Sequence, residues 1–201
     1  MNSAIKIFAA IVFFSVHALA SMPELSGDGQ APVRETANLK AFVGFGGGNA
    51  LLLEDGTMIL TIRGGVSLNK NLRAGVWGST VASDVRNYNA PNHKAQYIDY
   101  NAAGAMAELQ LFNRNAFSIS FPLLVGCGYV NVLEEGVEDS QAKDGFFIAE
   151  AALHFNYQIT KALQVAIGGG YRLFLGINYE NLENADFNTP FAEVVFYWSE
   201  N

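Results

Sequence analysis

The chain has 201 residues, half of which are hydrophobic, while only 15% are charged and 20 are glycine. This length suits a single domain with a sizeable core. The formal net charge of −7 argues against nucleic acid as a partner, because a nucleic-acid-binding domain normally carries a basic patch. Cys127 is the only cysteine, so an intrachain disulfide is excluded and this residue is expected to serve as a small hydrophobe.

Residues 1–20 have the layout of a secretory signal peptide. Lys6 is their only charge, an apolar stretch follows it, and Ala18-Leu19-Ala20 supplies a cleavage site. The alternative, a retained membrane anchor, needs a longer span than this stretch offers. Residues 21–37 are polar and contain prolines and glycines, which predicts a flexible lead-in. The folded domain is therefore expected over residues 38–201.

The stretch VGFGGGNA, residues 43–50, raises the question of a phosphate-binding turn. A dinucleotide fingerprint needs G-x-G-x-x-G between a strand and a helix. Here Asn49 replaces the third glycine, and Asp55-Gly56 gives a turn signal soon after. We therefore expect no bound cofactor and interpret the stretch as the end of a strand that enters a long loop. Its inward-facing glycines, like those of Gly168-Gly169-Gly170, would make room for bulky interior side chains.

From residue 38 onward the hydrophobic pattern has a period of two almost everywhere, which is typical of β-strands. In residues 147–159, apolar side chains share one face, while Glu150, His154 and Asn156 occupy the other. Such runs exceed the ~5 to 6 residues of an ordinary strand and match the ~9 to 11 that cross a bilayer at a tilt. We expect eight strands, near residues 38–47, 57–68, 72–84, 96–112, 116–132, 145–159, 163–177 and 189–198.

The connections between these strands alternate between two kinds. Three are short, each with a basic residue at its tip: Lys70, Arg114 and Lys161. Tight turns at one end and long loops at the other predict an all-β fold, an eight-stranded antiparallel up-and-down transmembrane β-barrel. The four long, polar connections are expected at about residues 49–56, 85–95, 133–144 and 178–188.

The stretch FFIAEAALHFNYQITKALQVAIGGGYRLFLG, residues 146–176, resembles the F-F-x-x-E … N-x-x-x-T-K … G-x-x-Y-R pattern of small uncharacterised outer-membrane barrel proteins. The signal peptide, the eight strands and the alternating connections also resemble the small outer-membrane barrels of OmpA/OmpX type. This resemblance implies the outer membrane of a Gram-negative bacterium as location, with outer-membrane lipid and the barrel-assembly machinery as partners. It supplies no catalytic residue.

Charged residues recur on the face opposite the apolar one. A barrel of about eight strands is just wide enough for side chains to fill it, and an unpaired charge in such an interior is costly. We therefore expect a mutually neutralising network that fixes strand register and plugs the lumen, with a proton or ion pathway as the alternative. The predicted members are Lys40, Arg63, Arg73, Glu108, Glu150, His154, Arg172 and Glu193.

Acidic residues dominate the four long connections. We expect solvated loops kept apart by charge repulsion. A sharper alternative is the bridging of divalent cations to anionic lipid headgroups, since hard cations favour clustered carboxylates. No ligand ladder of EF-hand type is present, so no specific metal site is predicted. The cluster that could contact a cation consists of Glu134, Glu135, Glu138 and Asp139.

Two features disturb the simple strand pattern. Pro122 lies inside the fifth strand and predicts a bulge or a local break, because proline cannot donate to the ladder. Asp99 and Asn101 lie on the outward face of the fourth strand, whose outer half is therefore expected to project beyond the lipid. Aromatic girdles are expected at both interfaces, from Phe155, Tyr157, Phe196 and Trp198 at one end and from Tyr97, Tyr129 and Phe147 at the other.

These patterns favour a structural or adhesive outer-membrane barrel without enzymatic activity, whose acidic loops face the exterior and contact surface ligands. The first alternative is a barrel enzyme acting on envelope lipids, with His93 or His154 as base, although no catalytic triad can be assembled from the spacing. The second is a soluble lipocalin-like ligand binder. A continuous apolar exterior opposes that second alternative.

Overall fold

The computed structural model describes residues 39–53, 55–83, 85–87, 96–134, 142–179 and 182–200. Among these residues, no helix is long and apolar enough to cross a membrane. The predicted signal peptide and lead-in lie outside them, as do His93, Glu135, Glu138 and Asp139, and the side chain of Glu134 is not described.

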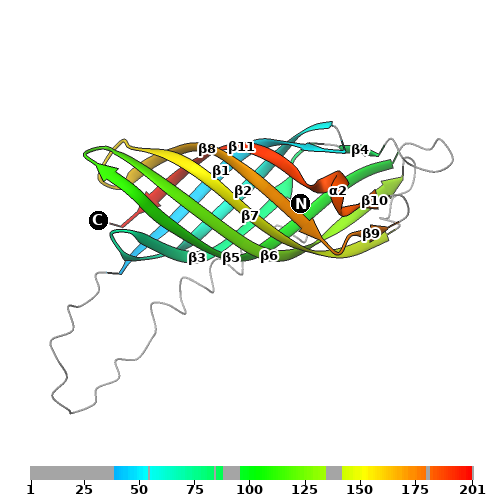
Figure 1. Ribbon diagram of the computed structural model, residues 1–201, viewed down its shortest axis with the longest axis horizontal. Helices are drawn as coiled ribbons and strands as arrows, with labels where there is room; N and C mark the ends of the chain where they lie inside the picture. Colours follow the sequence, from blue (N-terminus) through cyan, green and yellow to red (C-terminus); the bar gives the residue numbers. More distant parts are fainter. Residues whose placement is uncertain are drawn as a thin grey trace, which may run out of the picture.

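Eight long strands follow one another in the order that the sequence predicts (Figure 1). The shortest has 10 residues and the longest has 19, so each is long enough to cross a bilayer at a tilt. The strands are β1 (Lys40–Leu52), β2 (Asp55–Asn69), β3 (Leu72–Val81), β5 (Gln96–Arg114), β6 (Phe117–Glu134), β7 (Ala142–Gln158), β8 (Leu163–Leu175) and β11 (Thr189–Ser199).

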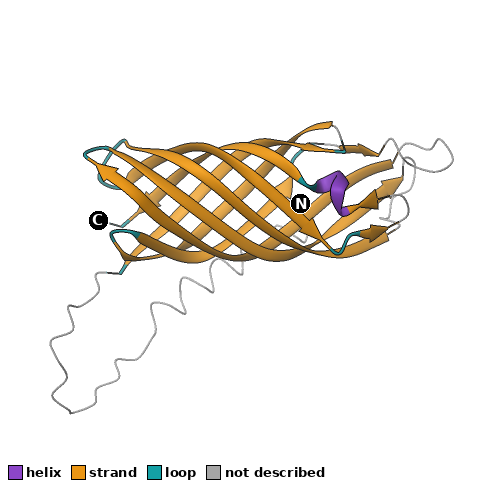
Figure 2. Ribbon diagram, viewed as in Figure 1, coloured by secondary structure: helices purple, strands orange, loops and turns teal. Residues whose placement is uncertain are grey.

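These strands form one closed barrel, which Figure 2 shows from the side. Consecutive long strands pair antiparallel, and the ring is completed where β1 pairs with β11. Between β3 and β5 the pairing is also direct, although β4 (Val85–Asn87) lies between them in the sequence. The predicted eight-stranded antiparallel up-and-down β-barrel is therefore confirmed.

The register gives the barrel a pronounced stagger. The paired residues can be followed once around the sheet from Leu175 on β8, whose partner on β7 is Phe147. The path ends where Phe196 on β11 pairs with Val165, again on β8 but ten residues earlier. Such a stagger tilts the strands and sets the width of the barrel. Side chains far apart in the sequence consequently meet inside.

The three short connections lie at one end of the barrel (Figure 1). Their basic residues Lys70, Arg114 and Lys161 are exposed. In the last of these turns, Thr160 Oγ1 accepts a hydrogen bond of 3.0 Å from the backbone N–H of Leu163. A threonine hydroxyl that satisfies a backbone donor in this way stabilises a tight turn. The predicted turns are confirmed, and we refer to this end as the turn end.

The connection between β1 and β2 is shorter than predicted. The sequence indicated a long loop over residues 49–56, but β1 continues to Leu52 and β2 begins at Asp55. Leu53 turns the chain with a φ of 50°, a left-handed conformation that is uncommon outside glycine. Its backbone N–H donates to the carbonyl oxygen of Asp186 at 3.0 Å, which anchors the turn. The prediction was wrong because glycines that suggested a loop lie inside the strand.

The opposite end, which we call the loop end, carries short elements that the sequence did not predict. β4 pairs with β5, and β9 (Asn178–Tyr179) pairs with β10 (Leu182–Glu183). They are followed by a single helical turn, α2 (Asn184–Phe187), in which the N–H of Glu183 donates to Asp186 Oδ2 at 2.8 Å. This reciprocal capping arrangement satisfies donors that so short a helix cannot satisfy itself.

Pro122 interrupts the sheet on one side only. It is paired with Glu108 on β5, whereas the pairing of β6 with β7 stops after Ser120 and resumes at Leu123 in the same register. The predicted local break is therefore present at Pro122. The bulge itself lies elsewhere, because the register between β5 and β6 shifts between Gln110 and Phe112.

Candidate functional site

The barrel interior holds three groups of charged and polar side chains, and the first joins β2, β7 and β11. Arg63 Nη2 lies 2.5 Å from Glu193 Oε1, and the same oxygen lies 2.8 Å from His154 Nε2. Arg63 Nη1 also donates to the Tyr197 hydroxyl at 2.9 Å. All four side chains are buried. One carboxylate thus holds both the guanidinium and the imidazole, in the charge-assisted contacts that are strongest away from water.

The second group joins β5, β7 and β8. Arg172 Nε lies 2.7 Å from Glu150 Oε1, and the two residues are direct partners across β7 and β8. Arg172 Nη1 donates to the Tyr100 hydroxyl at 2.7 Å. The guanidinium also lies 4.9 Å from the ring centroid of Phe191, within the range of a cation–π contact. Arg172 and Glu150 are both buried, so each depends on the other for charge compensation.

The third group lies close to the turn end, since Arg73 is the second residue of β3. Arg73 Nη1 is 3.5 Å from Glu108 Oε1, and Arg73 Nη2 donates to Gln164 Oε1 at 2.8 Å. Its guanidinium carbon lies 5.5 Å from the ring centroid of Phe42 and 5.1 Å from that of Tyr197. Because Tyr197 contacts both Arg63 and Arg73, it links this group to the first.

Glycines separate the members of the first group within the sheet. Gly168 on β8 pairs with His154 on one side and with Glu193 on the other. A Cβ atom at Gly168 would stand 2.0 Å from the carbonyl oxygen of Leu153 and 2.6 Å from His154 Cδ2, which no real side chain tolerates. The contact between His154 and Glu193 therefore passes over a residue that must lack a side chain.

Gly44 on β1 serves the same purpose for the other hydrogen bond of this group. It pairs with Tyr197 on β11 and with Arg63 on β2. A Cβ atom there would stand 2.8 Å from the Tyr197 ring. The glycine-rich stretch that suggested a phosphate-binding turn is thus a strand whose inner face leaves space for Tyr197 and Arg63.

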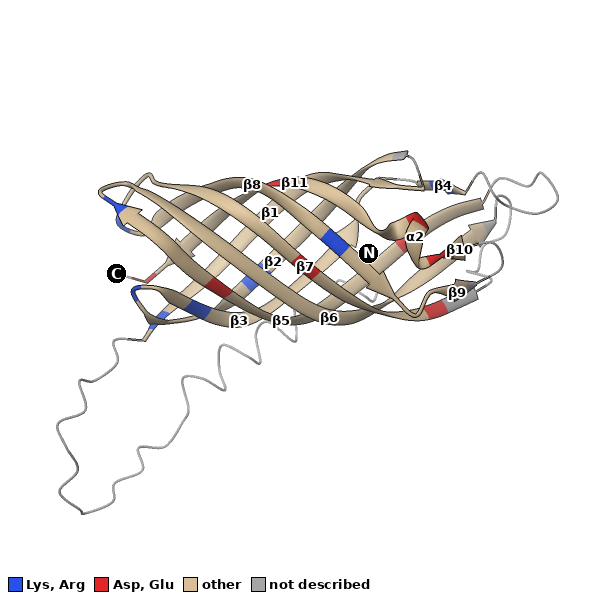
Figure 3. Ribbon diagram, viewed as in Figure 1, with Lys and Arg blue, Asp and Glu red and all other residues tan. Residues whose placement is uncertain are grey.

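The formal charges of the three groups cancel. Three arginines face three glutamates, and each arginine lies within 4 Å of a glutamate oxygen. Figure 3 marks positions of both charges along several strands of the barrel. We use the name inner charge network for Arg63, Arg73, Glu108, Glu150, His154, Arg172 and Glu193.

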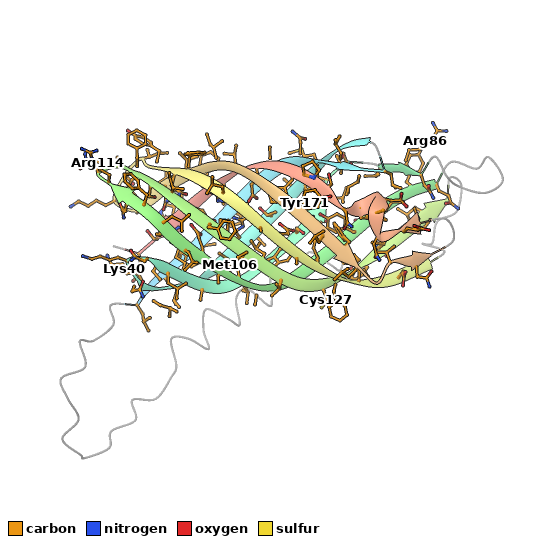
Figure 4. The ribbon with its side chains drawn as sticks, viewed as in Figure 1. Lys40, Arg86, Met106, Arg114, Cys127 and Tyr171 are labelled. Atoms are coloured by element: carbon orange, nitrogen blue, oxygen red, sulfur yellow. The ribbon has the colours of Figure 1, made fainter. Side chains whose placement is uncertain are left out.

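Lys40 is the exception among the predicted members. It is the first residue of β1 and is exposed at the turn end, where Arg114 also lies (Figure 4). The alternation along β1 suggested an inward direction, but a residue at the rim of a barrel reaches water whichever way it points. The prediction of Lys40 as an interior residue was therefore wrong.

The space left among these side chains is small. A cavity of about 10 Å³ is bordered by Thr61, Arg172, Phe191 and Glu193. A cavity needs roughly 10 to 15 Å³ to hold one water molecule. This cavity therefore has no room for a solute larger than water.

Toward the loop end the interior becomes apolar. Tyr100, Phe146, Phe174 and Phe187 form a chain of ring contacts, with centroid distances of 5.9 Å from Tyr100 to Phe146, 5.0 Å from Phe146 to Phe174 and 5.6 Å from Phe174 to Phe187. All four are buried, and Phe187 comes from α2. We call these four residues the aromatic plug. It covers the inner charge network on the side of the loops.

Tyr100, Gln164 and Tyr197 contact arginines of the inner charge network but were not among the predicted site residues. They lie on the inner face of their strands, as the predicted charged residues do. The period-two pattern therefore held the signal needed to find them. They were missed because only formally charged side chains and histidine were considered as interior partners.

The described residues offer little support for catalysis. His154 is fully buried, and its Nε2 contacts Glu193, so an external substrate cannot reach it. No group of three or more His, Cys, Asp or Glu residues in the described part of the chain could hold a metal ion. The cation-contacting cluster proposed from the sequence is not tested, because Glu135, Glu138 and Asp139 lie outside the described residues and the side chain of Glu134 is not described.

The outer wall contrasts with the interior because large apolar side chains cover it. Examples from different strands are Phe45, Val125, Phe147, Ile167 and Trp198, each with more than half of its surface exposed. The largest contiguous apolar patch of a typical water-soluble monomer covers roughly 300 to 600 Å². An apolar face that continues around a barrel instead suits contact with hydrocarbon.

A scan against models of protein families and a search of curated proteins each gave no match to the sequence. Solved structures are similar in fold. Neisserial surface protein A is 13% identical, with a TM-score of 0.56, and the match covers 80% of this chain and 95% of that one. The N-terminal β-barrel domain of Pseudomonas aeruginosa OprF is 9% identical, with a TM-score of 0.56 and coverage of 80% and 97%. The resemblance to small eight-stranded barrels is therefore confirmed at the level of the fold.

Proposed function

We propose that this protein is a small outer-membrane β-barrel with a filled lumen, which serves a structural or surface-interaction role in a bacterial envelope. The observation that carries the proposal is the opposition of the two faces of its sheet. Outside, apolar side chains cover the wall, while inside, two buried arginines and the half-buried Arg73 are matched by three buried glutamates. A water-soluble barrel needs the reverse arrangement.

The length of the strands supports a bilayer location. A transmembrane strand needs ~9 to 11 residues, and every long strand of the barrel meets this length. Closure of the sheet supports it as well, because hydrocarbon offers no partner for an unpaired backbone edge. The lipocalin-like alternative lacks such support, because it needs a polar exterior and an open cavity.

The filled interior favours a structural role over transport. The inner charge network occupies the middle of the lumen, and the aromatic plug closes it toward the loops. The cavity beside Arg172 and Glu193, about 10 Å³, is too small to hold a solute larger than water. Contacts with partners would then be made outside the barrel, by the connections at the loop end.

A surface role is consistent with the architecture at the loop end. β5, β6 and β7 are the longest strands, with 19, 18 and 17 residues. They carry their connections farther than a bilayer of ordinary thickness requires. One protein of similar fold is named a surface protein, Neisserial surface protein A. We propose that the loops face the cell exterior and that their acidic residues, including the cluster from Glu134 to Asp139, contact cations or surface ligands.

The test is fractionation of the bacterial envelope, followed by electrophoresis of boiled and unboiled samples. We expect the protein in the outer-membrane fraction, without residues 1–20, and with a mobility that changes on boiling because a closed barrel resists detergent at room temperature. Recovery in the soluble periplasmic fraction, with one mobility before and after boiling, would refute the proposal.

A further inference from the structure

The outer wall carries a groove over β1, between β2 and β11. The groove has a volume of about 470 Å³, and Gly47 forms its floor. Its sides are formed by Phe45, Met58, Leu60, Val194 and Phe196. Phe45 and Phe196 are direct partners across β1 and β11, so both side chains lie at the same end of the groove.

Glycine at position 47, on the floor of the groove, is not required by close contacts with neighbouring atoms, unlike the glycines on either side of it. A Cβ atom at Gly46 would stand 2.8 Å from Thr61 Oγ1, and one at Gly48 would stand 2.2 Å from the Ala192 carbonyl oxygen. At Gly47 the nearest atom would be Leu60 Cδ2 at 3.5 Å, an ordinary contact. A larger residue would therefore fit at position 47. The effect of glycine at this place is to hollow the wall.

The groove is apolar along its length and polar at one end. Phe45, Leu60 and Phe196 are 58%, 43% and 50% exposed, so their side chains stand clear of the wall. Asn49 is exposed and lies farther toward the loop end on the same face of β1. A carboxamide can donate to and accept from an ester or a hydroxyl group. The lining thus matches a molecule with a long apolar part and a polar end.

The dimensions fit a single hydrocarbon chain. Four residues separate Phe45 from Asn49, a distance of ~13 Å along an extended strand. One leaflet contributes about half of the ~30 Å hydrocarbon core, that is ~15 Å. The floor is one strand wide and is flanked by Leu60 on β2 and Val194 on β11. A groove whose floor is one strand wide suits a flexible chain better than it suits the convex wall of a second barrel.

We propose that this groove binds one acyl chain of an outer-membrane lipid, with the polar part of the lipid next to Asn49. The proposal rests on the proposed function, since it places the outer wall in the bilayer. It goes further by assigning one lipid to one place on a wall that is otherwise coated by exchanging chains. Gly47 is then the residue on which binding depends most.

The test replaces Gly47 with leucine, which fills the groove without meeting the backbone. Gly64→Leu is the matched control, because Gly64 lies on the same outer wall, a Cβ atom there would meet only the Phe42 carbonyl oxygen at 3.7 Å, and it does not line the groove. Each protein is refolded into dimyristoylphosphatidylcholine vesicles, extracted into detergent and weighed by native mass spectrometry. We expect one retained lipid on the wild type and on Gly64→Leu, and at least tenfold lower retention on Gly47→Leu.

Equal lipid retention on all three proteins would contradict lipid binding in the groove. A wild-type mass equal to that of a dimer, which Gly47→Leu reduces to that of a monomer, would contradict it as well, because a second copy of the chain would then occupy the groove. Mobility before and after boiling is measured on the same samples. If the wild type does not insert into the vesicles, the proposed function itself fails. If only Gly47→Leu fails to insert, Gly47→Ala takes its place, and lipid retention equal to the wild type contradicts the proposal.

Discussion

The middle of the barrel interior and its loop end are filled in different ways. In the middle, and as far as Arg73 near the turn end, arginines and glutamates contact one another at 2.5 to 3.5 Å. Toward the loop end, the rings of Phe146, Phe174 and Phe187 pack at centroid distances of 5.0 and 5.6 Å. Charge-assisted hydrogen bonds depend on direction, whereas ring packing depends mainly on volume. The inner charge network thus governs which strands align, whereas the aromatic plug seals the lumen.

The largest effect is expected from breaking the buried pair on β7 and β8. Arg172→Leu leaves Glu150 buried without its counter-charge, which typically costs about 3 to 5 kcal/mol. Unfolding in urea, followed by the loss of the compact electrophoretic form in detergent, measures the difference from the wild type. Unchanged stability would mean that the network does not hold the strands.

The double variant Arg172→Leu with Glu150→Leu separates charge from packing. Replacing both members of a buried pair by apolar residues is often neutral or stabilising. We therefore expect the double variant to regain most of the stability that Arg172→Leu loses, in the same urea titration. If the double variant is as unstable as the single one, the loss arises from packing rather than from an orphaned charge.

The aromatic plug should respond in a different way. Phe187→Ala removes a fully buried ring, and such changes cost about 3 to 5 kcal/mol in a core that cannot relax. We expect a loss near the lower limit, about 3 kcal/mol, because α2 lies at the loop end and can settle into the space. Hydrogen exchange should increase around α2 and the loop end of β8, but not around Arg63. Equal increases in both regions would contradict a division of the interior into two parts.

A smaller effect is expected where a glycine lets two network residues meet. Gly168→Ala places a Cβ atom 2.0 Å from a backbone oxygen, so the strands must shift. Overpacking of this kind costs about 1 to 3 kcal/mol. Gly47→Ala is the control, because its Cβ atom meets no atom closer than 3.5 Å. If both variants have similar urea midpoints, the close contact between a Cβ atom at position 168 and the backbone is not the reason for glycine there.

The smallest effect is expected at Lys40, which lies at the rim. Surface substitutions away from special contacts usually change stability by less than about 0.5 kcal/mol. Lys40→Ala should therefore match the wild type in urea unfolding, unlike any arginine of the inner charge network. A loss of stability comparable to that of Arg172→Leu would indicate that Lys40 lies in the interior.

The period-two pattern was the part of the sequence from which the fold could be predicted. It placed Glu150, Arg172 and Glu193 on the same face as one another, and the tight turns with basic tips fixed the order of the strands. Which of these charges pair could not be predicted, because Arg63 and Glu193 are separated by 130 residues and by the intervening strand β1. Their contact depends on the stagger of the closed barrel, which one strand alone does not reveal.

The aromatic plug and the β1–β2 turn escaped prediction for a different reason. Phe187 lies in a polar stretch that has no strand period, so nothing in the local sequence shows that a helical turn would carry it into the lumen. Glycines after Val43 suggested a loop because glycine is frequent in turns. In the barrel, several of them are required by neighbouring side chains or backbone atoms across the sheet.

The native cysteine can report whether the outer wall faces hydrocarbon or water. Cys127 is exposed on the outer wall, opposite Phe147 on β7, and can carry a nitroxide label without any substitution (Figure 4). In protein refolded into phospholipid vesicles, we predict that dissolved oxygen relaxes the label strongly and that a water-soluble nickel complex does not, because the wall faces hydrocarbon. Strong relaxation by the nickel complex, with little effect of oxygen, would place this wall in water and contradict the account.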